Sequence, residues 1–148
     1  MKDQQGTILS VNRAGTKGTK KHPVGAGRFV EEQGMELDAH AGPGERQVSL
    51  LAKESIDKMR AKGLEVDFGA FAENLTTEGI DLAAFPLGTR LRIGGEVRLE
   101  ITRIGKECHA RCQIYHTVED CVMPREGVFA RVLAGGVVSA GDRIDTED

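Results

Sequence analysis

Thr89 to Ile104 reads TRLRIGGEVRLEITRI, two short alternating runs joined by a Gly-Gly pair. Apolar side chains recur at every second position on both sides of the pair: Leu91, Ile93, Val97, Leu99 and Ile101. A period of two is typical of a β-strand with one buried face. The Gly94-Gly95 pair supplies the positive φ angles that a two-residue turn needs. This stretch therefore predicts a β-hairpin.

Two further segments extend the β pattern. Gly6 to Asn12, GTILSVN, alternates apolar and polar residues and predicts an opening strand. Gly127 to Ile144, GVFARVLAGGVVSAGDRI, has the layout of the hairpin: a run, the pair Gly135-Gly136, a second run and a Gly141-Asp142 turn. We therefore expect a second hairpin there.

The clearest helical segment is Ser49 to Gly63, SLLAKESIDKMRAKG. One face collects side chains at three-to-four spacing: Leu51, Ser55 or Ile56, and Met59. Ser49 suits the N-cap and Gly63 suits the end, so we expect a helix from Leu50 to Lys62. A short second helix is expected in GIDLAAF, before Pro86.

Composition agrees with a chain of many short strands. Aromatic residues make up 4%, there is no Trp, and 19 residues are Gly, which favours tight turns between strands. Short strands avoid exposed edges most simply by closing on themselves. We predict one mainly β domain over residues 1–148, a small closed or nearly closed β-barrel with one or two short peripheral helices.

Charge and hydropathy exclude several classes of partner. The net charge is −3, whereas nucleic-acid binding usually needs a basic excess. The opening MKDQQGTILS has no apolar core of a signal peptide, and no apolar run approaches membrane-spanning length. We expect a cytoplasmic protein that binds neither nucleic acid nor membrane.

All three cysteines and two of the four histidines fall in Gly105 to Cys121, GKECHARCQIYHTVEDC. Positive neighbours favour the thiolate form of Cys108 and Cys112, and a thiolate binds metal or attacks sulfur. These neighbours are Arg103, Lys106, His109 and Arg111. Structural zinc remains an alternative, although a Cys-x3-Cys spacing without a second tight pair is a weak zinc signal. Cys121, beside Val122, fits a buried apolar role.

Glu36 to Ala52, ELDAHAGPGERQVSLLA, is a candidate binding segment. Asp38 and His40 share one face of an extended backbone. Arg46 precedes the predicted helix, and a guanidinium beside a helix N-terminus forms an anion site. The alternative is an Asp38–His40 hydrogen bond with a surface arginine.

Two further polar stretches are the Glu73-Asn74 pair and a basic run from Lys17 to Lys21. In FGAFAENLTTEGIDL, Phe68 to Leu82, the Glu73-Asn74 pair interrupts an apolar frame. Asn74 either satisfies loop backbone or reads a ligand through its amide. The basic run Lys17 to Lys21, KGTKK, is expected to be a solvated loop.

Four pieces in order resemble the MOSC domain, the domain found at the C-terminus of molybdenum-cofactor sulfurases and in small bacterial proteins. They are DAHAG with RQVSLLA, then FAENLTTEGIDL, then LGTRLRIGGEVRLEITRIGKEC, and then GVFARVLAGGVVSAGD. The resemblance covers Gly6 to Ile144 and is closest to the small stand-alone bacterial branch. It departs in one place, because the larger branches have Cys-x2-Cys where this chain has Cys-x3-Cys.

The resemblance implies a barrel-like fold and a role in molybdenum-cofactor biology. The chain would bind the molybdenum-pterin cofactor or carry sulfur on a cysteine, with Cys108 and Cys112 both candidates for the operative thiol and metal ligand. Candidate cofactor-binding residues are His40, Arg46, Asn74 and Arg111. Expected partners are a cysteine desulfurase or molybdenum-cofactor biosynthesis proteins. The chain is too short to hold its own pyridoxal-phosphate site, and at most a sulfur-transfer or molybdenum-dependent activity is expected.

Two alternatives from other classes stay open at this point. One is a self-sufficient small molybdenum oxidoreductase, which the short chain disfavours because little remains to bury a cofactor and bind an electron donor. The other is a β-barrel protein whose cysteines are structural, with or without zinc.

Overall fold

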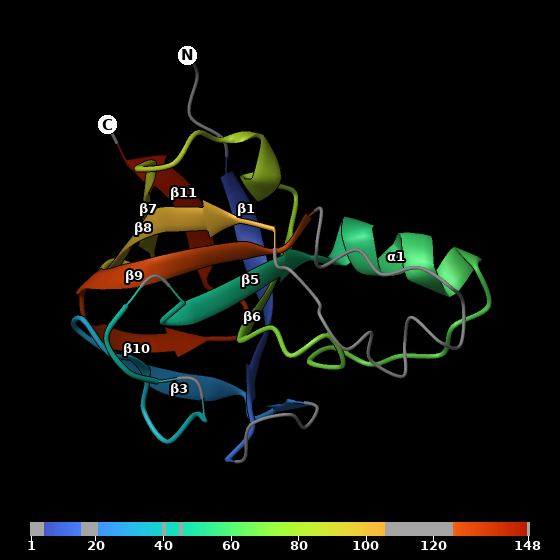
Figure 1. The fold of residues 1–148 in the computed structure, drawn as a ribbon, viewed down its shortest axis with the longest axis horizontal. Coiled ribbons are helices and arrows are strands. Elements are labelled where there is room, and N and C mark those ends of the chain that lie inside the picture. The colour runs from blue at the N-terminus through green and yellow to red at the C-terminus, as the bar shows by residue number, and fades with distance from the viewer. Residues whose placement is uncertain (1–4, 16–20, 40, 45, 106–125, 148) are drawn as a thin grey trace.

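The computed structural model describes residues 5–15, 21–39, 41–44, 46–105 and 126–147. Within these ranges the chain is mainly β, as predicted, with one α-helix and one 3-10 turn. Figure 1 shows a barrel with helix α1, Lys53–Ala61, on its outside beyond the end of strand β5. The 3-10 turn η1, Leu82–Ala84, lies where the short second helix was expected.

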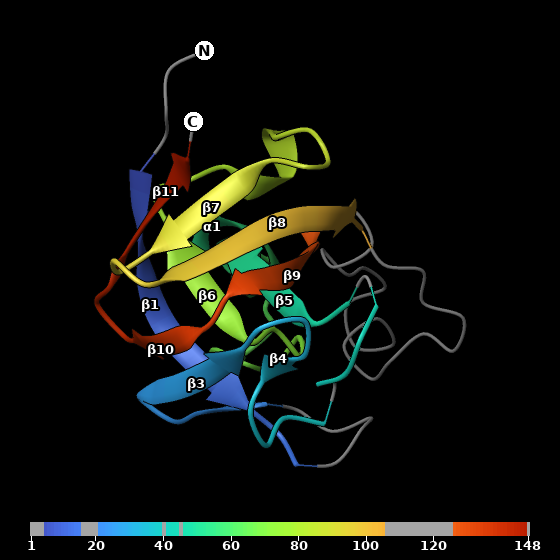
Figure 2. The same cartoon turned by 90° about the vertical axis from the view of Figure 1, so that its left-hand side faces the viewer.

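Seven of the described strands form a closed barrel. Their order is β11-β7-β8-β9-β5-β6-β1, and pairing between β1 and β11 closes the ring (Figures 1 and 2). The bounds are β1 Gln5–Arg13, β5 Val48–Ala52, β6 Leu75–Glu78, β7 Arg90–Ile93, β8 Val97–Ile104, β9 Val128–Ala134 and β11 Arg143–Glu147. All neighbours are antiparallel except β5 and β6. The predicted closed barrel and opening strand are confirmed.

A smaller sheet covers one end of the barrel (Figure 2). It has the order β10-β3-β4, with β10 at Gly136–Ser139, β3 at Ala26–Val30 and β4 at Gly34–Met35. Strand β2, His22–Pro23, pairs with the end of β1.

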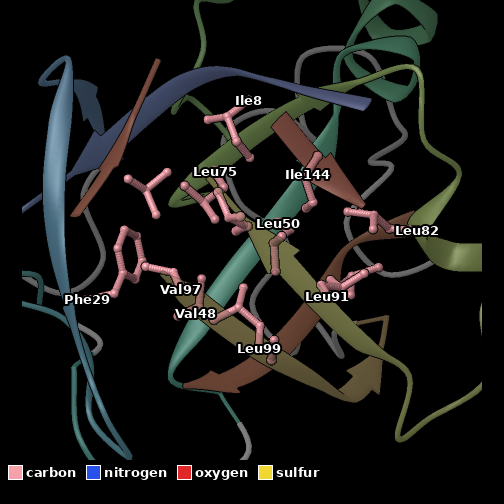
Figure 3. Close-up of a cluster of buried hydrophobic side chains, with 14 of the residues drawn as sticks. Ile8, Phe29, Val48, Leu50, Leu75, Leu82, Leu91, Val97, Leu99 and Ile144 are labelled. Carbon is pink, nitrogen blue, oxygen red and sulfur yellow. The ribbon is translucent and has the colours of Figure 1, made fainter. Parts of the chain in front are cut away.

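Apolar side chains from every barrel strand meet inside the ring (Figure 3). Ile8, Leu50, Leu75, Leu99 and Ile144 each have 0% exposure. The inward positions of the hairpin at β7 and β8 are confirmed, since all five predicted apolar residues are buried. Burying one such side chain contributes about 1.5–3 kcal/mol, which makes this interior the main source of stability.

The turn of this hairpin is longer than predicted. Ile93 is paired with Val97, so the loop has three residues, Gly94 to Glu96. Gly94 alone has a positive φ in this loop, 69°. The expected two-residue turn was wrong because Glu96 belongs to the loop. Alternation alone does not distinguish this residue from the first residue of the next strand.

The predicted second hairpin is wrong. Strand β9 pairs with β8 and β5, whereas β10 leaves the barrel and pairs with β3. The chain crosses between the sheets at Gly135, where a Cβ atom would lie 2.5 Å from the carbonyl oxygen of Phe29. This glycine pair therefore permits a close backbone approach and does not form a hairpin turn. The Gly141-Asp142 turn is present, but it leads into β11, which pairs with β1 and β7.

The helix begins later than the sequence predicted. Ser49, Leu50 and Leu51 belong to β5, and α1 starts at Lys53 without a side-chain cap. Leu50 faces the barrel interior while Leu51 packs under α1, so both faces of this strand are buried. A strand with two buried faces gives a continuous apolar run that periodicity cannot distinguish from a helix. The predicted helix face is otherwise confirmed, since Ser55, Ile56 and Met59 are buried.

No helix among the described residues has both the length and the apolar character needed to cross a membrane.

Candidate functional site

The two ends of the cysteine-bearing connection lie side by side where β8 ends and β9 begins. The backbone N–H of Gly105 donates to the carbonyl oxygen of Gly127 at 2.7 Å. One step inward, Arg103 is paired with Phe129. The connection between these ends carries the predicted residues Cys108, Arg111 and Cys112, which lie outside the described residues, as do His109 and Cys121.

Arg46 lies over this edge of the barrel. Its guanidinium carbon is 5.5 Å from the centre of the Phe129 ring, and its side chain is exposed. A cation over an aromatic face is attracted by the ring quadrupole, which holds the guanidinium here without neutralising it. Within the described part of the chain, Arg46 has no carboxylate partner. An exposed guanidinium of this kind can bind a phosphate or carboxylate group.

The prediction that Arg46 lies beside a helix N-terminus is wrong. Strand β5 lies between Arg46 and α1, so the helix N-terminus is not adjacent to the guanidinium. Moreover, β5 is paired on both sides, which engages its backbone N–H groups in the sheet. Any anion at Arg46 would therefore be bound by the side chain without help from a helix dipole.

Asn74 is buried beneath this edge and is fully engaged by the fold. Its Oδ1 accepts from the backbone N–H and the hydroxyl of Ser49, at 3.1 Å and 3.2 Å. Its Nδ2 donates to the carbonyl of Asn12 at 3.3 Å and contacts the sulfur of Met35 at 3.8 Å. Of the two roles left open for this amide, the structure provides the satisfaction of backbone. Contact of Asn74 with a cofactor stays a prediction.

A buried polar network continues from Asn74 below the site. Ser10 donates to Asn12 Oδ1 at 2.6 Å, and Asn12 Nδ2 donates to the carbonyl of Glu73 and the hydroxyl of Thr76, both at 3.1 Å. This role of β1 was not predicted from the sequence, although Ser10 and Asn12 recur at the alternate positions that follow Ile8 and were a usable signal. Buried networks of this kind hold loops in one arrangement when every member is satisfied.

Glu73 anchors the loop before β6. Its carboxylate accepts from the backbone N–H of Gly69 at 3.0 Å, that of Phe71 at 3.2 Å and the hydroxyl of Thr76 at 2.9 Å. Burial raises the pKa of Glu73 above its ordinary value, and the hydrogen bonds offset part of this effect. These donors fix the 69–74 loop, which carries Asn74, against the start of β6.

Lys21 and Asp38 form a buried ion pair next to this network. Lys21 Nζ lies 2.8 Å and 2.7 Å from the two carboxylate oxygens, and both side chains have 0% exposure. Asp38 also accepts from the backbone N–H of Ala14, and the Lys21 N–H donates to the carbonyl of Gly69. The pair thus ties together three segments around the site.

Two expectations change at this pair. Lys21 was expected in a solvated run and is buried instead, because Asp38 compensates its charge. Asp38 was expected to share a face with His40, but His40 lies outside the described residues. Burial alone would raise the pKa of Asp38, yet the hydrogen bonds from Lys21 and Ala14 outweigh it and lower the pKa below its ordinary value.

The described residues fit part of a molybdenum-pterin cofactor. Arg46 supplies an exposed guanidinium suited to a terminal phosphate. Asn74 does not fit the pterin edge as it stands, because its amide is occupied and 1% exposed. Among the described residues there is no group of three or more His, Cys, Asp or Glu placed to hold a metal ion. The candidate metal ligands Cys108 and Cys112 lie outside that set.

This combination defines a class: a small closed β-barrel whose candidate site lies on loops at one edge, with a supporting buried polar network. The family model of the MOSC domain matches residues 36–145. The chain therefore belongs to the MOSC domain family, which is associated with molybdenum-cofactor-related function. The matched segment contains Asp38, Arg46, Asn74 and the whole cysteine-bearing connection.

Solved structures share this fold at low sequence identity. The YuaD protein from Bacillus subtilis has a TM-score of 0.82 and 17% identity, covering 98% of this chain and 97% of its own. YiiM from Geobacillus stearothermophilus has a TM-score of 0.72 and 21% identity, covering 97% of this chain and 75% of its own. YiiM from Escherichia coli has a TM-score of 0.64 and 19% identity, covering 100% and 71%. No curated protein matches the chain.

Proposed function

We propose that this protein is a molybdenum-cofactor-associated module that uses a cysteine thiolate in residues 106–125 to carry sulfur or to ligate molybdenum. The observation that supports this most directly is the position of Arg46. Its guanidinium lies over Phe129, two residues from Gly127, the point where the cysteine-bearing connection rejoins the barrel. A cation for a cofactor phosphate therefore lies at the edge of the barrel where the two ends of the cysteine-bearing connection meet.

The supporting network suits a site that must be held open to a ligand. Asn74 fixes Ser49 in β5, and Ser49 is paired with Phe129 in β9. The Phe129 ring under Arg46 is therefore carried by a strand that is held by buried hydrogen bonds, and the ring itself packs in the apolar cluster beneath α1. Pre-organisation of this kind lowers the entropy lost on binding.

Sulfur transfer needs only thiol chemistry from this chain. The thiolate of Cys108 or Cys112 attacks the terminal sulfur of a donor persulfide, a new S–S bond forms, and the donor thiolate leaves. Arg111 and its basic neighbours would favour the thiolate at neutral pH. A cysteine desulfurase is the partner class that generates such a persulfide, and its pyridoxal phosphate stays with that partner.

If the cofactor is bound, Arg46 would hold its phosphate, and a cysteine with His40 or Arg111 would contact the remainder. The molybdenum centre supplies the redox or sulfur-accepting chemistry. Replacing Arg46 with Ala should then lower the molybdenum and phosphopterin content of protein purified from a cofactor-competent host by about tenfold. Arg28→Ala, at an exposed arginine of the small sheet, is the matched control and should retain both. Loss of thermal stability in Arg46→Ala with unchanged cofactor content would contradict this role.

The cysteines are tested by single Cys→Ser variants at positions 108, 112 and 121. Each variant is incubated with a cysteine desulfurase and free cysteine, and persulfide is read by mass spectrometry; metal is measured in parallel. The operative position should lose persulfide or molybdenum, while Cys121→Ser keeps both. Alkylation at several pH values should show that the operative thiol reacts well below the ordinary pKa of about 8.5.

Other outcomes would identify the alternatives. Stoichiometric zinc lost in both Cys108→Ser and Cys112→Ser would indicate a structural metal site. Thiols that titrate normally, with no variant changing sulfur or metal uptake, would assign the cysteines to packing. Turnover of a substrate by the isolated, molybdenum-loaded chain would favour a self-sufficient oxidoreductase.

A further inference from the structure

A second charged feature lies on the outer face of the barrel, away from the edge where β8 ends and β9 begins. A hollow of about 290 Å³ is lined by Arg92, Gly94, Gly95, Arg98, Arg143 and Asp145, from β7, β8, β11 and the hairpin turn. Arg98 lies near the start of β8 and Gly105 follows its end, seven residues later. At about 3.3 Å per residue, roughly 20 Å separate the hollow from that edge.

The neighbouring row of this face shows what a solvated, charge-balanced arrangement looks like here. Going across the strands, Glu147 is opposite Arg90, Arg90 is opposite Glu100, and Glu100 is opposite Arg131. Charges alternate along this row, and the Arg131–Glu100 pair has an Nε–Oε1 distance of 2.8 Å. Alternating cross-strand charges stabilise a sheet.

The row at the hollow breaks that alternation. Asp145 is opposite Arg92, but Arg92 is opposite Arg98. Like charges directly opposite each other destabilise a strand pair. Arg143 adds a third guanidinium, and its Nε lies 3.3 Å from the same carboxylate that Arg92 approaches at 3.6 Å. Asp145 is thus shared by two arginines.

The carboxylates nearby do not saturate these donors. Arg98 Nε contacts Glu147 at 3.2 Å, and Glu147 is also the cross-strand partner of Arg90. Each guanidinium carries five N–H donors, so the two carboxylates of Asp145 and Glu147 cannot occupy all the donors of the three arginines. All three arginines are about half exposed, at 47%, 50% and 59%. Gly94 and Gly95 also line the hollow and add no side chain to it.

We propose that this hollow, formed by Arg92, Arg98 and Arg143, is a binding site for a phosphoryl group. Guanidinium groups bind phosphate oxygens in a bidentate manner, and a doubly charged oxyanion would relieve the repulsion between Arg92 and Arg98. Neither the cysteines nor the proposed function is needed for this site. An acidic protein segment is the competing occupant, but the small volume of the hollow, about 290 Å³, favours a small ligand.

The experiment is an NMR titration of the isotopically labelled full chain with pyrophosphate and inorganic phosphate, at constant ionic strength maintained with sodium chloride. We expect saturable shifts at the amides of Gly94 and Gly95 and at the arginine Nε–H signals. Arg92→Gln and Arg98→Gln should each weaken binding about tenfold. In neither variant is a carboxylate left alone, since Asp145 keeps Arg143 and Glu147 keeps Arg90.

Two matched variants separate a built site from general charge. Arg90→Gln removes the same charge from the next outward position of the same strand, and should leave affinity unchanged within about twofold. Asp145→Asn removes the competing carboxylate and should tighten binding severalfold, a gain that loss of folding cannot imitate. Shifts that do not saturate, equal losses in Arg90→Gln and Arg92→Gln, or tighter binding of an octaglutamate peptide than of pyrophosphate would each overturn the proposal.

Discussion

The buried pair of Lys21 and Asp38 links the loops around the candidate site. It joins residues near the end of β1 to the segment that leads to Arg46, and both charges are removed from water. Taking one charge away from such a pair leaves the other buried and uncompensated, which is more costly than removing both.

Asp38→Asn should therefore destabilise the protein by about 3–5 kcal/mol. The double variant Lys21→Met with Asp38→Asn should recover most of this loss, because Asn can still accept from the Ala14 N–H. Urea unfolding at pH 7 measures both. A single variant within about 0.5 kcal/mol of the wild type would show that the pair is not a structural anchor.

The same pair predicts an acid-dependent loss of stability. The pKa of Asp38 in the folded state lies below its ordinary value of 3.8, so the folded state binds its proton less readily than the unfolded state. The stabilisation that ionised Asp38 gives the folded state is fully present above pH 3.8, and it is lost as pH falls through the folded-state pKa. Glu73, with a raised pKa, has the opposite sign.

We expect the stability difference between the wild type and the Lys21→Met, Asp38→Asn double variant to be constant from pH 5 to 7. Below pH 3.8 the free energy of unfolding of the wild type should fall relative to that of the double variant. Urea unfolding at half-unit pH steps measures the difference, in which the contribution of Glu73 cancels. A difference that does not change across pH 3.8 would contradict the ion-pair assignment.

At the scale of elements, the two Gly-Gly pairs have the same sequence and different structural roles. Gly95 belongs to a hairpin loop, and a Cβ atom there would meet nothing within 4 Å. Gly135 lies where the chain leaves the barrel for the small sheet, against the backbone of Phe29.

Gly135→Ala should destabilise the protein by about 1–3 kcal/mol, because its Cβ would lie 2.5 Å from a carbonyl oxygen that has little freedom to move. Gly95→Ala is the control and should change stability by less than about 0.5 kcal/mol. Thermal and urea unfolding compare the two. Equal effects would mean that glycine is needed at both sites only for flexibility.

At the scale of the whole molecule, closure of the barrel depends on one short strand. β11 pairs with β7 on one side and with β1 on the other, so it has no free edge. In an open sheet the same strand would be an edge with unpaired backbone groups.

Native-state hydrogen exchange tests this closure. Amides of Ile144 and Thr146 should exchange with about the same free energy of opening as Leu99 in β8, since both strands open only with global unfolding. Exchange orders of magnitude faster in β11 than in β8 would indicate that the barrel opens between β1 and β11.

The sequence by itself determined the class of fold and the family. Alternation around Gly94-Gly95 and in GTILSVN depends on nearest neighbours along the strand. This local signal correctly predicted the strands and placed Leu91 and Leu99 on one buried face. The four ordered pieces identified the MOSC family, which the family model confirms. The clustering of Cys108 and Cys112 within residues 105–121 was also visible from sequence alone.

Only the tertiary structure decided which strands pair, where β5 gives way to α1, and which polar residues support the site. The sequence pattern at Leu50 and Leu51 suggested a helix because both faces of β5 are covered, one by the barrel interior and one by α1. Lys21 was predicted to be solvated, because nothing in the local sequence shows that its partner is Asp38, 17 residues away. Gly135 was predicted to form a turn, because the backbone that approaches it closely belongs to Phe29, more than a hundred residues earlier in the chain. In each case the deciding neighbour is remote in sequence, and local patterns carry no information about it.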